Sequence, residues 1–90
     1  MDNAVIVSGA RTPIGRYGGA FKSLKASDLG AVAIKNAIER SGITPSDVEE
    51  VILGNALQTD EAGYAARMAS LKSGISHEVP TIAILSLIHI

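Results

Sequence analysis

Two segments of the chain, residues 40–43 and 72–75, share one pattern: a basic residue, a serine, a glycine and an isoleucine. A basic residue in the last turn followed by glycine is typical of the C-terminal end of a helix. We therefore expect one helix that opens at Ser27 or Asp28 and ends near Arg40, and a second over about residues 62–73. These ends divide the chain into two units of similar length.

Short apolar segments precede each predicted helix. Residues 3–8 form a continuous run rich in β-branched side chains, which predicts a strand buried on both faces. We expect a second strand over residues 50–54 and a third that starts near Thr81. Strands that alternate with helices indicate a parallel sheet, so the predicted fold class is α/β in the order β-α-β-α-β.

The connections carry their own signals. Residues 9–24 contain Pro13 and several glycines and are predicted to form a loop. Residues 44–47 (TPSD) combine a threonine cap, a proline at the first helical position and an acidic residue, which predicts one helical turn before the second strand.

The bulk composition excludes several functions. The chain has 90 residues, a net charge of −1 and no cysteine. Its length predicts one domain at most, and its charge gives no footprint for nucleic acid or an anionic membrane. The N-terminus lacks the basic region and long apolar run of a secretory signal, and the absence of cysteine agrees with a reducing compartment, so we expect a cytoplasmic protein.

The last ten residues, TIAILSLIHI, are too short to span a bilayer, which takes roughly 20 apolar residues. Residues 85–90 can be encoded by CTGTCTCTTATACACATC, the transposase mosaic-end sequence used in sequencing-library preparation. We expect residues 1–84 to be genuine protein and residues 85–90 to be a translated adapter. The alternative is an ordinary strand that matches the adapter by chance.

The sequence resembles the thiolases, that is, acetyl-CoA acetyltransferases and 3-ketoacyl-CoA thiolases. The resemblance spans residues 4–84 and rests on blocks in fixed order: residues 10–15 (ARTPIG), 18–19 (GG), 28–30 (DLG), 51–55 (VILGN), 57–58 (LQ), 66–67 (AR), 71–75 (LKSGI) and 79–80 (VP). Two places depart from the usual pattern: residues 59–64, and Lys25, where a serine cap is common.

The resemblance implies a thiolase-like layered α/β fold, of which this chain would be a truncated N-terminal portion. It implies an enzyme of fatty acid metabolism that condenses or cleaves 3-oxoacyl-CoA through a cysteine thioester, with coenzyme A thioesters as substrates and a homodimer or homotetramer as the assembly. In the family an Asn-x-x-Cys-x-Ser-Gly segment follows the third strand. That pattern would place asparagine at position 85 and the nucleophile at 88, where this chain has Leu85 and Ile88. We therefore expect the 90-residue chain to be inactive, with no catalytic, cofactor-binding or metal-binding residue of its own.

Other candidate sites are weaker. The glycines of residues 15–19, with Arg11, Arg16 and Lys22, could form a phosphate cradle. They match neither G-x-G-x-x-G nor G-K-[ST], so a structural turn is the preferred interpretation.

The remaining polar and sulfur-containing side chains have ordinary interpretations. We expect His77 to be a solvated surface histidine rather than a metal ligand. Asp47, Glu49 and Glu50 could be paired carboxylates for acid–base work, but a helix-start acid and a charged approach to a strand are preferred. Met68 is predicted to fill the core. Arg67 could pair across a subunit or layer boundary, but a helix side chain that reaches solvent is preferred.

Two functions of other classes stay open at this point. One is a small α/β interaction module with no catalytic role. The other is a relative of the ketoacyl synthases, which share the fold, although the loop of residues 11–15 (RTPIG) argues against it.

Overall fold

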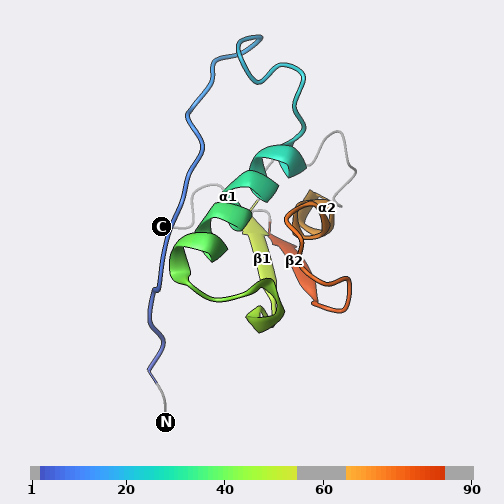
Figure 1. Ribbon diagram of the computed structural model, residues 1–90. Helices are drawn as coiled ribbons and strands as arrows, with labels where there is room; N and C mark the ends of the chain where they lie inside the picture. Colours follow the sequence, from blue (N-terminus) through green and yellow to red (C-terminus); the bar gives the residue numbers. More distant parts are fainter. Residues whose placement is uncertain (1–2, 55–64, 85–90) are drawn as a thin grey trace.

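The computed structural model describes residues 3–54 and 65–84. Within those ranges the chain forms helix α1 (Ala26–Ser41), the single 3-10 turn η1 (Pro45–Asp47), strand β1 (Val51–Gly54), helix α2 (Ala65–Lys72) and strand β2 (Thr81–Ile84). Figure 1 shows α1 and α2 side by side, and α2 also packs against both strands. The predicted α/β class is confirmed from the first helix onward.

The N-terminus of α1 lies one or two residues before the predicted start, with Lys25 in extended backbone at the N-cap. Lysine has no side-chain acceptor for the free N–H groups of the first turn. Asp28 contributes the other half of a capping box, because its Oδ2 accepts a hydrogen bond from the Lys25 backbone N–H at 2.9 Å. The N-terminus of the helix is therefore stabilised by Asp28, although lysine is an unfavourable N-cap residue.

Both helices end as the repeated pattern predicts. Gly42 and Gly74 adopt φ of 79° and 95°, in the left-handed region that glycine enters without a Cβ clash. After α2 the Gly74 N–H donates to the Leu71 carbonyl at 3.2 Å and the Ile75 N–H donates to the Ser70 carbonyl at 3.3 Å. These two bonds form a Schellman motif, and the buried Ile75 closes it.

The turn at residues 44–47 is also confirmed. Pro45 begins η1, and the Thr44 N–H donates to the Asp47 carboxylate at 3.0 Å. This local hydrogen bonding reverses the chain after α1 and directs it into β1.

The two strands are parallel and pair in register, Val51 with Thr81 through Gly54 with Ile84. The Val51 N–H donates to the Pro80 carbonyl at 3.0 Å, just before β2. Alternate residues face the two helices, and the opposite face carries Ile52, Ile82 and Ile84, which are 59%, 45% and 45% exposed. Among residues 3–54 and 65–84, the helices thus cover one face of the sheet.

Small residues let the two helices pack closely. A Cβ built on Gly30 of α1 would lie 3.2 Å from the Cβ of Ala69 in α2, and Ala69 is 0% exposed. The face of α2 toward the core carries the buried residues Ala65, Ala66 and Ala69. The seam between the helices is therefore built of glycine, alanine and serine rather than of large side chains.

The predicted strand over residues 3–8 is wrong. The segment is extended but pairs with neither β1 nor β2, and the side chains of Val5, Ile6 and Val7 are 76%, 95% and 65% exposed. Figure 1 shows it, in blue, outside α1. Its end contacts that helix: the Ser8 hydroxyl donates to the Ala37 carbonyl at 2.6 Å, and Arg40 donates to the Gly9 carbonyl at 3.2 Å. A β-strand requires hydrogen bonds to a neighbouring strand, and here the segment contacts a helix instead.

Other element boundaries agree within the usual fraying of ends. The second strand starts at Val51 rather than at residue 50, and the third starts at Thr81 as predicted. The predicted start of the second helix at residue 62, and the segment 85–90, lie outside the described residues.

Candidate functional site

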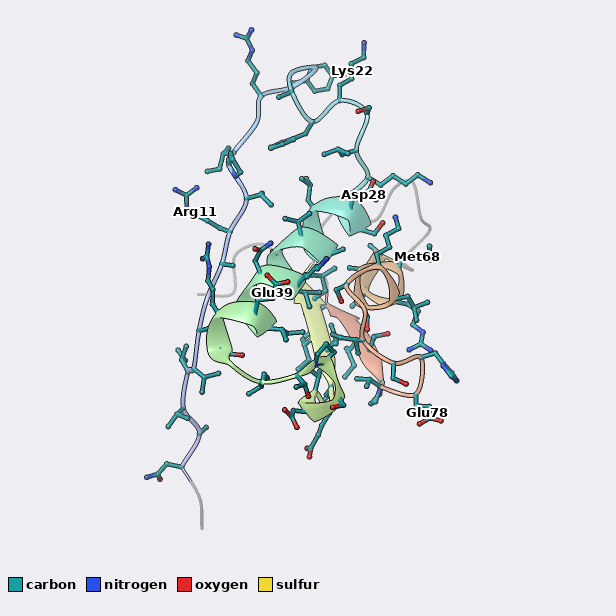
Figure 2. The ribbon with its side chains drawn as sticks, viewed as in Figure 1. Arg11, Lys22, Asp28, Glu39, Met68 and Glu78 are labelled. Carbon is teal, nitrogen blue, oxygen red and sulfur yellow. The ribbon has the colours of Figure 1, made fainter. Side chains whose placement is uncertain are left out.

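The conformation of the glycine-containing loop favours the structural interpretation over a phosphate cradle. It makes successive turns, with the Gly19 N–H donating to the Arg16 carbonyl at 2.9 Å and the Lys22 N–H to the Gly19 carbonyl at 3.1 Å. Figure 2 shows Lys22 at the tip of the loop and Arg11 well down one arm. Lys22 and Arg11 therefore do not converge on one point.

His77 and the three acidic residues at the entry to β1 also lie where the sequence interpretation put them. His77 is exposed in the connection between α2 and β2. Asp47 accepts hydrogen bonds from Thr44, whereas Glu49 and Glu50 are exposed. Within residues 3–54 and 65–84, no group of three or more His, Cys, Asp or Glu residues is arranged to hold a metal ion.

Met68 is a correction to the sequence interpretation. It is 37% exposed, and Figure 2 shows its side chain on the outer side of α2, away from α1. Successive residues of a helix point in different directions. Because Ala69 faces the core, Met68, which precedes it, lies on the solvent side.

Arg67 makes contacts within the chain rather than simply reaching solvent. Its Nη1 donates to the Val79 carbonyl at 2.9 Å, and its Nη2 donates to the His77 carbonyl. The guanidinium is therefore bound within the chain, to the backbone that leads into β2. No sequence pattern indicated this contact, because its partners are main-chain carbonyls.

The sequence pattern did not indicate one polar cluster, which joins Lys72 at the end of α2 to Ser27 and Asp28 at the start of α1. Lys72 Nζ donates to Ser27 Oγ at 2.7 Å and to Asp28 Oδ1 at 2.9 Å. Ser27 is 0% exposed, whereas the two charged side chains are about one-third exposed. The hydrogen bond from the Lys25 backbone, and next that from Lys72, hold the pKa of Asp28 below its ordinary value. The cluster joins the two helices across their seam.

A small hollow of about 230 Å³ lies between the C-terminal half of α1 and the turn before η1. Its lining includes Lys35, Glu39, Ile43 and Pro45. Pockets for drug-sized ligands run from about 300 to 1,000 Å³, so this hollow is below that range. Its charged groups are one lysine and one glutamate on neighbouring turns of α1, an arrangement common on any helix surface.

The feature most relevant to chemistry is the edge of the sheet where β1 and β2 both end. Parallel strands present their carboxyl ends on one side, and ligands of α/β proteins bind outside that edge. Gly54 and Ile84 are paired there. The carboxyl edge of this strand pair is therefore the candidate position for a site. Because the whole chain contains no cysteine, it cannot supply a thiol nucleophile.

Comparison with known proteins agrees with this arrangement. Residues 4–87 match the family model described as thiolase, N-terminal domain. The chain belongs to the thiolase family. The match includes three residues of segment 85–90, whose adapter origin stays a prediction.

The similar proteins are named after an enzymatic activity. Probable acetyl-CoA acyltransferases of Staphylococcus aureus strains NCTC 8325 / PS 47 and COL are each 43% identical over 84 residues, which is 93% of this chain and 21% of the relative. The protein of the same name from the bovine strain RF122/ET3-1 has the same identity and coverage. This thiolase chain therefore spans about a fifth of the length of the curated relatives it matches.

Within residues 3–54 and 65–84, neither helix has both the length and the apolar character needed to cross a bilayer.

Proposed function

We propose that this chain is the N-terminal part of a CoA-dependent acyltransferase that condenses or cleaves 3-oxoacyl-CoA. The observation that carries the proposal is the family match over residues 4–87, together with 43% identity to probable acetyl-CoA acyltransferases over 84 residues. The parallel β1–β2 pair supplies a carboxyl edge that suits such a site.

The chemistry of the longer enzyme follows from a thiolate nucleophile. In cleavage, the thiolate attacks the 3-oxo carbonyl, the bond between C2 and C3 breaks, and acetyl-CoA leaves after C2 takes up a proton. The acyl group, held as a thioester, then passes to the thiol of a second coenzyme A. Condensation is the reverse. The residues described contribute the strand that leads toward this nucleophile and the helices that support it.

The first test is to read the source DNA through codons 80–100 with long reads. An open frame that continues as Asn-x-x-Cys-x-Ser-Gly from codon 85 supports the proposal. A stop codon after Ile90 in the genomic DNA would refute it, because the product would have no cysteine.

The second test is kinetic. The full-length protein, expressed from that frame, is expected to cleave acetoacetyl-CoA when free coenzyme A is added, and the 90-residue chain is expected to show no turnover. Absence of thiolysis by a folded full-length protein would contradict the proposal.

We propose further that the full-length protein is a cytoplasmic homodimer or homotetramer. This rests on the resemblance to thiolases and, for the compartment, on the absence of cysteine from these 90 residues. Light scattering coupled to size-exclusion chromatography of the full-length protein tests the assembly, and a monomeric mass would contradict it.

A further inference from the structure

Arg67 holds the segment that enters β2. Its side chain leaves α2 next to two fully packed positions, Ala66 and Ala69, which are 2% and 0% exposed. Its two guanidinium nitrogens donate to the carbonyls of His77 and Val79. The packing of α2 against α1 fixes the backbone of α2. The Arg67 guanidinium therefore ties the loop between α2 and β2 to a fixed helix.

The bound carbonyls lie directly before the first hydrogen bond between the strands. The next carbonyl, that of Pro80, accepts from the Val51 N–H at 3.0 Å. The same loop has an internal turn, in which the Val79 N–H donates to the Ser76 carbonyl at 3.1 Å. Arg67 therefore acts at the point that determines where β2 starts along β1.

The strand transmits that position to the site. From Val79 to Ile84 is five residues, and at about 3.3 Å per residue the strand spans roughly 16 Å. A short two-stranded pair is marginally stable by itself, so an additional anchor at one end of β2 limits its movement at the other. The carboxyl end of β2 is the edge where a parallel sheet places its chemistry.

We propose that Arg67 is a positioning residue for the acyl-transfer reaction, because it fixes the register of β2 and thereby the place of the nucleophile that follows the strand. The inference rests on the proposed function. It assigns to a side chain on α2 an effect on turnover at the opposite end of the sheet.

Arginine is specifically suited to this role. The planar fork reaches two carbonyls separated by one residue, whereas a lysine ammonium is a point donor on a flexible stem. Methionine retains an unbranched apolar stem and donates no hydrogen bond. A comparison of Arg67→Lys with Arg67→Met therefore distinguishes the effect of the two hydrogen bonds to carbonyls from the effect of packing by the apolar stem.

The test uses the full-length protein. Arg40→Met is the matched control, since Arg40 also lies on a helix and donates to one backbone carbonyl, that of Gly9, remote from β2. Thiolysis of acetoacetyl-CoA gives kcat and KM. The pH dependence of thiol alkylation by iodoacetamide reports the environment of the nucleophile, which a loss of global stability alone would leave unchanged.

We expect Arg67→Met to lower kcat by about tenfold to a hundredfold with little change in KM, as displacement of a reacting group by about 1 Å does. The alkylation midpoint should move to higher pH, because a displaced thiol loses the N–H groups that favour thiolate. Arg67→Lys should retain an intermediate kcat, and Arg40→Met should match the wild type.

Three results would overturn the inference: a wild-type kcat in Arg67→Met, an equal loss of kcat in Arg40→Met, or an unchanged alkylation profile. If Arg67→Met does not fold, the same criteria apply to Arg67→Lys. If the folded wild-type protein has no thiolysis activity, the proposed function fails and this role fails with it. An active wild type with unaffected variants refutes the role of Arg67 alone.

Discussion

The seam between α1 and α2 should not accept a larger side chain at Ala69. This residue is 0% exposed, and a Cβ placed on Gly30 would already lie 3.2 Å from its Cβ. Ala69→Leu adds three carbon atoms at the point where Gly30 of α1 approaches α2. The helices must move apart or the leucine must adopt a strained rotamer.

Overpacking of this kind costs about 1–3 kcal/mol. A chain of this size has a total stability near the lower end of about 5–15 kcal/mol, so the loss is a large fraction of it. Met68→Leu is the matched control, since it is one residue away on the same helix, 37% exposed and nearly unchanged in volume. Its effect should be within about 0.5 kcal/mol.

Urea-dependent proteolysis of the 90-residue chain displayed on a cell surface measures both variants without interference from self-association. With m near 1 kcal/mol per molar urea, Ala69→Leu should lower the midpoint by about 1 M or more. A midpoint at or above that of the wild type would refute the close helix seam. Equal shifts in the two variants would show that proteolysis does not report this contact.

Three further changes have definite expected outcomes. Lys25→Ser should stabilise the chain by about 0.5–1 kcal/mol in the same assay, because serine supplies the N-cap acceptor that lysine lacks; a destabilised variant would contradict the capping role. The pKa of Asp28 is lowered in the folded state, so its contribution is present above about pH 4 and is lost as the pH falls toward the lower folded pKa. Asp28→Asn should therefore flatten the acid limb of a stability-versus-pH curve, and an unchanged limb would count against the interaction. Gly74→Ala should cost about 1–2 kcal/mol because φ is 95° there, whereas Gly54→Ala, which has open space around it, serves as the control; equal losses would contradict the strain argument.

The sequence predicted the elements whose signals are local. Both helix ends were found from a basic residue, serine and glycine, and η1 was found from threonine, proline and aspartate. In each case the determining hydrogen bonds join residues no more than five positions apart, such as Ile75 to Ser70. Such interactions form from a single segment, so a pattern of adjacent residues is sufficient to indicate them.

The predictions that failed depended on distant partners. The apolar pattern of residues 3–8 indicates a tendency to be extended, but a strand forms only where another strand pairs with it. The alanines around Met68 predict a core position, whereas the direction of its side chain depends on where α1 lies. The contacts of Arg67 with His77 and Val79 were invisible, because every residue offers a backbone carbonyl.

The candidate site was predictable only in outline. The alternation of strands and helices indicates a parallel sheet, and a parallel sheet indicates an active edge at its carboxyl ends. The Lys72 contact with Ser27 and Asp28 joins residues more than forty positions apart in the chain. Charge alone could not select this pairing among the other acidic and basic residues of the sequence.

The exposed surface of the chain supports its relation to a longer protein. A compact monomer of 9.3 kDa exposes about 5,000 Å², whereas this chain exposes 7008 Å². Part of the excess is apolar, on the face of the sheet that carries Ile52 and Ile82. Parallel sheets are normally covered on both faces, since each strand presents apolar side chains to both. Both helices of the described residues lie on the same face, so the elements needed to cover the other are not among them. This agrees with a chain that spans 21% of its relatives.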